Sequence, residues 1–150
     1  MKPLPAPARQ GATLLLVDDN PHGLIARQTV LEELGYTIHT GSSGADALTL
    51  LEKKKVDLVI TDFRMPNMDG VELINRIREA HGDIPIILLS GFVEPLGLTE
   101  ESTGADVVLA KSAGEVGFLI RSVKRLLNRP PRKPLESERL PSSKKVRSAG

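Results

Sequence analysis

The chain contains no cysteine, and aromatic residues make up only 3% of its 150 residues. Without thiols it forms neither disulfides nor thiolate metal sites, and a reducing compartment is compatible with its composition, so we expect a cytoplasmic location. Because aromatics are scarce, aliphatic side chains must fill the core. Hydrophobic residues, at 40% of the chain, are numerous enough to do so.

Long apolar runs are also missing. No stretch approaches the ~18 consecutive apolar residues of a membrane span. The Pro- and Ala-rich start lacks the apolar segment of a signal peptide. The sequence therefore predicts no association with a membrane.

The net charge is only +1, but it is unevenly distributed. Residues 1–127 hold 13 Lys and Arg against 17 Asp and Glu, whereas residues 128–150 hold 7 against 2. The acidic body argues against a nucleic-acid surface, and the basic tail would make at most weak charge contacts with nucleic acid or an acidic partner. Composition predicts disorder for 1–11 and for the Pro/Ser/Lys/Arg-rich tail 128–150, on either side of one domain over 12–127.

Three apolar runs in this domain each end on a polar residue. The runs are Leu14–Val17, followed by Asp18 and Asp19; Leu58–Thr61, followed by Asp62; and Ile86–Leu89, followed by Ser90. Continuous runs of this kind are typical of strands buried on both faces in a parallel sheet. Since sites form beyond the carboxyl ends of such strands, we expect these polar residues to be neighbours.

Strands and helices are predicted to alternate along the domain. Expected strands cover 12–18, 36–40, 57–62, 84–90 and 106–110. Helix starts are expected at Asn20-Pro21, at Ser42 or Ser43, and at Ser112. In the last helix, a core-facing stripe is expected to comprise Val116, Leu119, Ile120, Val123 and Leu127. The alternation predicts an α/β fold: a doubly wound, flavodoxin-like sheet of five parallel strands in the order 2-1-3-4-5, with helices on both faces.

Three carboxylates converging on one crevice repel one another, and a divalent cation removes that cost. Asp18, Asp19 and Asp62 therefore indicate a Mg²⁺ site with room for phosphoryl oxygens. Ser90 could donate a hydrogen bond to a phosphoryl group, and Lys111 could place a positive charge beside it. A carboxylate can itself accept the phosphoryl group as an aspartyl phosphate.

Taken together, these residues resemble the receiver domain of two-component response regulators. The resemblance covers residues 12–127. It rests on Val17-Asp18-Asp19, Asp62, the run Met65–Gly70, Ser90-Gly91 and Lys111, in this order and at these spacings.

The resemblance implies a role for each matching residue. Asp62 would accept the phosphoryl group from a phosphohistidine on a sensor histidine kinase, from a phosphotransfer protein or from a small phosphodonor. Asp19 would bind Mg²⁺ directly and Asp18 through water, together with Asp62 and the backbone carbonyl of Arg64. Ser90 would be the switch hydroxyl, and Lys111 would pair with the phosphoryl group.

Four features depart from the family pattern. Lys111 is followed by Ser112 in place of the usual proline, so we expect a trans bond there, because a cis non-proline bond costs ~3–4 kcal/mol. Val108 replaces the usual aromatic residue that moves with the switch hydroxyl. Arg64 occupies a position that tunes dephosphorylation. The segment 92–104 shows only a weak helical pattern, interrupted by Pro95 and Gly97, where the family has its fourth helix.

The sequence favours a phosphoacceptor switch that signals to a downstream protein, with no turnover of an external substrate. One alternative is an aspartate-nucleophile phosphatase, although Asp18-Asp19-Asn20 lacks the Asp-x-Asp spacing of those enzymes. The other is a receiver-like module that binds proteins without phosphorylation. The tail is too short for an output domain, so the protein is either a stand-alone receiver or part of a larger chain. The sequence leaves homodimerisation open.

Overall fold

Strands and helices alternate along the chain, as the sequence predicts. The computed structural model describes residues 11–91, 97–112 and 114–129. The elements are β1 (Thr13–Val17), α1 (Pro21–Glu33), β2 (Thr37–Gly41), α2 (Gly44–Lys53), β3 (Leu58–Asp62), α3 (Gly70–His81), β4 (Ile86–Ser90), α5 (Glu100–Thr103), β5 (Val107–Ala110) and α6 (Glu115–Asn128). The predicted disorder of the two ends falls largely outside the described residues, as does Pro95.

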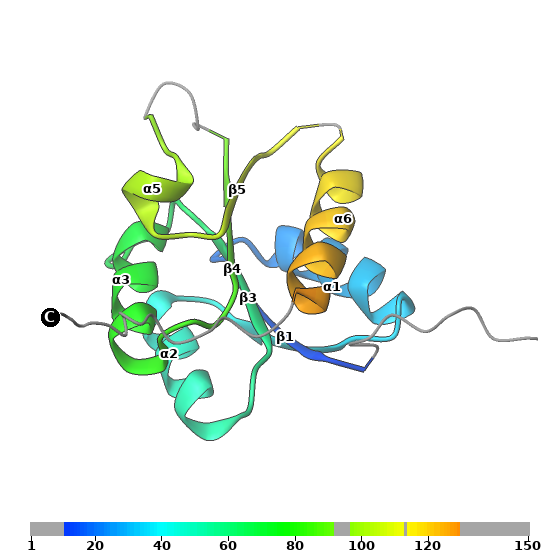
Figure 1. Ribbon diagram of the computed structural model, residues 1–150, viewed down its shortest axis with the longest axis horizontal. Helices are drawn as coiled ribbons and strands as arrows, with labels where there is room; N and C mark the ends of the chain where they lie inside the picture. The colour runs from blue at the N-terminus through cyan, green and yellow to red at the C-terminus, as the bar shows by residue number, and fades with distance from the viewer. Residues whose placement is uncertain (1–10, 92–96, 113, 130–150) are drawn as a thin grey trace, which may run out of the picture.

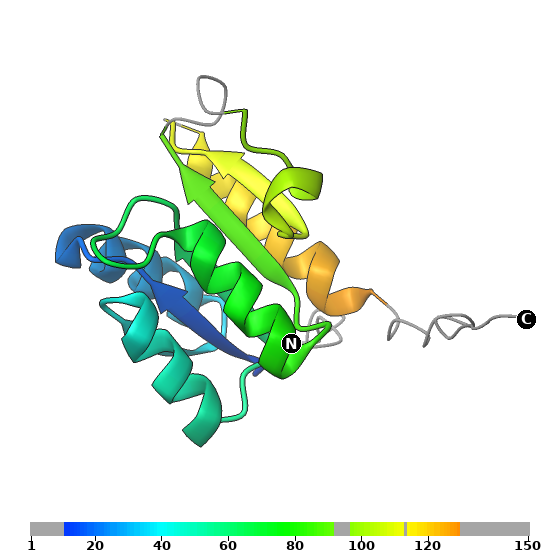
Figure 2. The same ribbon diagram turned by 90° about the vertical axis from the view of Figure 1, so that its left-hand side faces the viewer.

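All five strands run parallel in one sheet, in the order β2-β1-β3-β4-β5, which confirms the predicted topology. Helices cover both faces: α1 and α6 lie on one side of the sheet, and α2, α3 and α5 lie on the other (Figure 1 and Figure 2). Because helices cover both faces of the sheet, the central strands β3 and β4 are buried throughout.

The aliphatic core is divided by the sheet into two halves. Because successive side chains of a strand point to opposite faces, Leu14 and Leu16 pack with α1 and α6, whereas Leu15 and Val17 pack with α2 and α3. The same alternation runs through β3 and β4. Packing on both faces therefore fixes the register of the central strands, and with it the positions of the residues that follow them.

Most helix starts are capped as predicted. The Asn20 side chain accepts the His22 N–H ahead of Pro21, and Ser43 does the same for Asp46. Asp69 caps α3 by accepting the Glu72 N–H. In the segment where the sequence shows only a weak helical pattern, α5 is a single turn with a capping box between Thr99 and Ser102.

Two expectations for α6 were wrong. Ser112 is not the N-cap: the helix begins after Gly114, without a side-chain cap, and the Ser112 carbonyl accepts the Glu115 N–H at 3.0 Å. Val116 does not join the core-facing stripe but is 44% exposed, because Glu115 takes the inward position beside it. Leu119, Val123 and Leu127 are buried as predicted.

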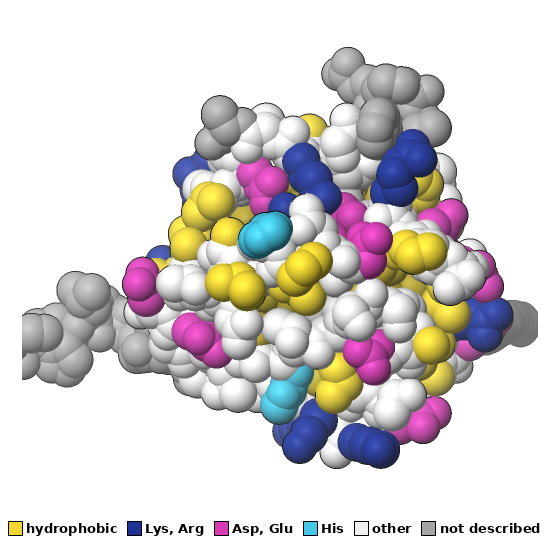
Figure 3. All heavy atoms as spheres, turned by 180° about the vertical axis from the view of Figure 1, so that it is seen from behind, with side chains coloured by type: hydrophobic (Ala, Val, Ile, Leu, Met, Phe, Trp, Pro, Cys, Tyr) yellow, Lys and Arg dark blue, Asp and Glu magenta, His cyan; other side chains and the backbone are white. Residues whose placement is uncertain are grey.

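The surface carries a mixture of charges. On the face seen in Figure 3, acidic and basic side chains are interspersed, and neither sign covers a continuous area. No helix among the residues that the structure describes is both long and apolar enough to cross a membrane.

Candidate functional site

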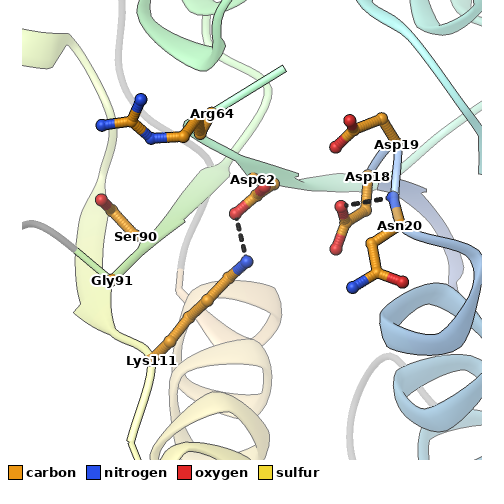
Figure 4. Close-up of a pocket in the computed structure, with 8 residues that line it drawn as sticks. All are labelled: Asp18, Asp19, Asn20, Asp62, Arg64, Ser90, Gly91 and Lys111. Carbon is orange, nitrogen blue, oxygen red and sulfur yellow. Dashed lines mark hydrogen bonds and ion pairs between the residues drawn. The ribbon is translucent and has the colours of Figure 1, made fainter. Parts of the chain in front are cut away.

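The polar residues that end the strands meet in one pocket at the carboxyl edge of the sheet. The pocket has a volume of about 330 Å³ and is lined by Asp18, Asp19, Asn20, Asp62, Arg64, Ser90, Gly91 and Lys111 (Figure 4). Every residue that the sequence singled out as a site residue is in this set. Asn20 and Gly91 line the pocket as well; the sequence indicated them only as a helix cap and as part of a Ser-Gly pair.

Strand register brings these residues to the same level. Val17 pairs with Thr61, so the residues that follow each of them, Asp18 and Asp62, lie side by side. Ser90 pairs with Ala110 across β4 and β5, and the Lys111 N–H donates to the Ser90 carbonyl at 3.0 Å. The sheet alone therefore places four of the side chains at one edge.

Three carboxylates form the acidic side of the pocket. Oxygen atoms of Asp18, Asp19 and Asp62 all lie within 4.8 Å of one another. Asp18 and Asp62 are buried, whereas Asp19 is exposed to solvent. Like charges this close disfavour ionisation unless a cation compensates them. Oxygen donors of this kind suit Mg²⁺, so the residues present fit the predicted metal.

Lys111 supplies a cation to the acidic group at the centre of the pocket. Its Nζ lies 2.5 Å from Oδ1 of Asp62, and the two side chains point toward each other (Figure 4). The pKa of Asp62 is nevertheless raised above its ordinary value, because burial and the Asp18 charge outweigh Lys111 and Arg27. Burial thus disfavours the charged form of the Asp62 carboxyl group.

Arg27 is a second cation that sequence reasoning missed. Its Nη1 donates to Oδ2 of Asp18 at 3.1 Å, and its Nε donates to Oε2 of Glu115 at 2.7 Å. The other Asp18 oxygen accepts the Asn20 N–H at 2.9 Å. Its place at helical spacing between Leu24 and Leu31, which face the core, was the available sequence signal, but its partner Glu115 is 88 residues away.

Ser90 and Arg64 lie on the opposite side of Asp62 from Asp18. Ser90 is buried at the end of β4, and Arg64 is exposed two residues after Asp62. In Figure 4 the Arg64 side chain extends away from the three carboxylates, toward the side of the pocket where Ser90 lies. The pocket therefore has a carboxylate side and a side with hydroxyl and guanidinium donors.

The structure describes two of the positions at which the sequence departs from the family pattern. The described residues contain no cis peptide bond, so the Lys111–Ser112 bond is trans, as expected. Val108 is half-buried in β5, and its N–H donates to Oε2 of Glu100 at 3.1 Å. This bond ties α5 to the edge strand at the position where the family has an aromatic ring.

Comparison with known protein families matches most of the chain to one family. The sequence profile of the response regulator receiver domain matches residues 14–123. This range contains every pocket residue.

Individual relatives agree with that match. The transcriptional regulatory protein GlrR of Escherichia coli K12 is 38% identical over 112 residues, which is 75% of this chain and 23% of GlrR. The sensor kinase CckA of Brucella abortus is 40% identical over 85 residues, 55% of this chain and 9% of CckA. The chain thus spans less than a quarter of the length of these curated relatives.

One solved structure is similar to this chain in both fold and sequence. The response regulator protein TrrA of Thermotoga maritima, in complex with Mg²⁺-BeF, superposes with a TM-score of 0.70 at 33% identity. The superposition covers 77% of this chain and 98% of the TrrA chain.

Proposed function

Because this chain belongs to the response regulator receiver domain family of two-component systems, we propose that it is a phosphoacceptor switch in which Asp62 carries the phosphoryl group. The observation that carries the proposal is the Asp62–Lys111 ion pair beside two further carboxylates. The donor would be a phosphohistidine of a sensor histidine kinase or phosphotransfer protein, or a small phosphodonor. A cytoplasmic location is part of the proposal.

Asp62 is suited to be the nucleophile because it is held at the centre of the pocket. One of its carboxylate oxygens attacks the phosphorus atom, the new P–O bond forms, and, when the donor is a phosphohistidine, its P–N bond breaks. The bonding electron pair leaves with the imidazole nitrogen. The ionised carboxylate of Asp62 attacks without first losing a proton, so positioning and charge compensation suffice for the reaction.

The surrounding residues would stabilise the added charge. Lys111 is close enough to Asp62 to shift its contact from the carboxylate to a phosphoryl oxygen. Ser90, on the other side, has a hydroxyl that could donate to the same group. Asp18, Asp19, Asp62 and the Arg64 carbonyl would hold Mg²⁺, which when bound neutralises phosphoryl and carboxylate charge.

The phosphorylated form would then be recognised by a downstream protein. We propose no turnover of an external substrate, since Asp62 retains the phosphoryl group as the signal until the aspartyl phosphate is hydrolysed. Val108, which has no aromatic ring to move, favours transmission through backbone shifts.

A phosphorylation-independent binding module remains the second candidate, and Val108 is the residue that favours it. The two are separated by adding beryllofluoride, a phosphoryl mimic, to the chain already saturated with Mg²⁺, and following the amide NMR spectrum. The proposal predicts shifts around Asp62, Ser90 and Lys111 in the parent and in the remote control Glu79→Ala, and none in Asp62→Ala. Unchanged parent spectra, or equal shifts in Asp62→Ala, would reject it.

A further inference from the structure

Arg27 joins the acidic pocket to the start of α6. It lies in the middle of α1 with only 12% of its side chain exposed, between the carboxylates of Asp18 and Glu115. Glu115 is the first residue of α6 and is itself buried. One guanidinium therefore connects a pocket residue with a helix that contributes nothing to the pocket lining.

The backbone of α1 is shaped to admit this ion pair. Gly23 lies one turn before Arg27, and a Cβ atom added there would be 2.9 Å from Oδ2 of Asp18 and 3.0 Å from Nη1 of Arg27. Real Cβ atoms are essentially never closer than 3.0 Å to such neighbours. A side chain at position 23 would require the end of the Asp18 or Arg27 side chain to shift, so the glycine leaves room for the ion pair.

The Arg27–Asp18 contact competes with a cation in the pocket. Oδ1 of Asp18 accepts the Asn20 N–H, and Oδ2 accepts the Arg27 guanidinium. A divalent cation at the acidic cluster shares the negative charge of this carboxylate and repels the guanidinium. The Arg27–Glu115 contact is then favoured over the Arg27–Asp18 contact, because Glu115 lies outside the cluster.

We propose that Arg27 couples cation binding at the acidic cluster to the N-terminal turn of α6, through its shared contacts with Asp18 and Glu115. This inference rests on the cation site of the proposed function. The turn that receives the change carries Val116 and Phe118, which are 44% and 52% exposed, with the Arg121 guanidinium 4.9 Å from the Phe118 ring centre. Cation occupancy would thus be reported on a surface remote from the pocket lining.

The test is a titration of the chain with Mg²⁺ alone, followed by amide NMR at two places. Shifts of Asp18 and Asp62 report binding at the cluster, and shifts of Glu115, Val116 and Phe118 report the response of α6. The parent is expected to show both, with one common midpoint. If the cluster residues do not respond, the cation site itself is rejected and this inference with it.

Arg27→Met tests the coupling separately from the site. It should still bind Mg²⁺ at the cluster, about fivefold more tightly because a nearby positive charge is gone, while the α6 shifts are lost. Arg78→Met is the matched control: Arg78 forms a half-buried ion pair with Asp106, 2.9 Å long, at the other end of the sheet. It should leave both responses unchanged.

A second variant keeps the inference testable if Arg27→Met does not fold. Glu115→Gln preserves the Arg27–Asp18 contact and removes the charge at the α6 end, so Mg²⁺ binding should persist with a diminished α6 response. Parent-like α6 shifts in whichever of these two variants folds, at full occupancy of the cluster, would overturn the coupling and leave the cation site intact.

Discussion

The Lys111 ammonium lies 2.5 Å from Oδ1 of Asp62. Asp62 is the last residue of β3 and Lys111 follows β5, and β4 lies between these two strands. The ion pair therefore spans the width of one strand at the carboxyl edge of the sheet. A carboxylate oxygen of Asp62 also lies within 4.8 Å of oxygens of Asp18 and Asp19. Asp62 is thus placed between a fixed cation and an acidic cluster suited to a metal.

Replacing Lys111 by methionine should slow phosphorylation of Asp62 by a small phosphodonor about 10²- to 10³-fold, as removing one preorganised charge from a reacting centre commonly does. The rate is measured by mass spectrometry of the intact protein at saturating Mg²⁺. Lys124→Met, an exposed lysine on α6, is the control and should keep the parent rate. A parent-like rate in Lys111→Met would remove Lys111 from the mechanism.

Asp62→Asn should stabilise the metal-free protein at neutral pH. The folded-state pKa of Asp62 is raised above 3.8, first by burial, so the folded state binds the proton more tightly than the unfolded state. By linkage, the parent loses stability as the pH rises from the pKa of Asp62 in the unfolded state through its raised pKa in the folded state, and the asparagine variant does not. Urea unfolding should show the difference growing with pH. A difference independent of pH would contradict this account.

Gly70→Ala should disturb the pocket through the backbone. A Cβ atom there would lie 2.5 Å from the Asp62 carbonyl oxygen and 2.8 Å from Cδ1 of Leu88. We expect a loss of about 1–3 kcal/mol in the free energy of unfolding and slower phosphorylation. Gly117→Ala, whose added Cβ meets only Arg121 Nη1 at 3.6 Å, should instead gain roughly 0.5–1 kcal/mol. Equal effects of the two substitutions would refute the argument.

Arg64→Asn should shorten the lifetime of the phosphorylated form about tenfold, equivalent to about 1.4 kcal/mol in the barrier to hydrolysis. The guanidinium can bind two phosphoryl oxygens at once or hinder the attacking water, and asparagine does neither as well. The decay of phosphorylated protein after removal of the donor measures the lifetime. An unchanged or longer lifetime would show that Arg64 is a solvated loop residue that does not slow hydrolysis.

The sequence was sufficient to predict the fold and six of the eight residues that line the pocket. Each central strand is a continuous aliphatic run because both of its faces are covered, and each run ends where the chain leaves the sheet. In a parallel sheet, that alone places Asp62 and Ser90 at the same edge. Right-handed crossovers left few possible strand orders, and the flavodoxin-like order was predicted from among them.

The link between Arg27 and Glu115 could not be predicted in this way. It depends on how α1 and α6 lie against each other on one face of the sheet, which no local pattern specifies. The same contact explains the error at Val116: periodicity favoured the apolar neighbour for the inward position, whereas the structure buries Glu115 because Arg27 is there to pair with it.

The central claim is tested most directly by locating the phosphoryl group after reaction with acetyl phosphate and Mg²⁺. The account predicts that the intact mass rises by one phosphoryl group, that peptide mapping after borohydride reduction places it on Asp62, and that Asp62→Asn gains none. A modified Asp62→Asn protein, or a parent that stays unmodified while its pocket binds Mg²⁺, would contradict it.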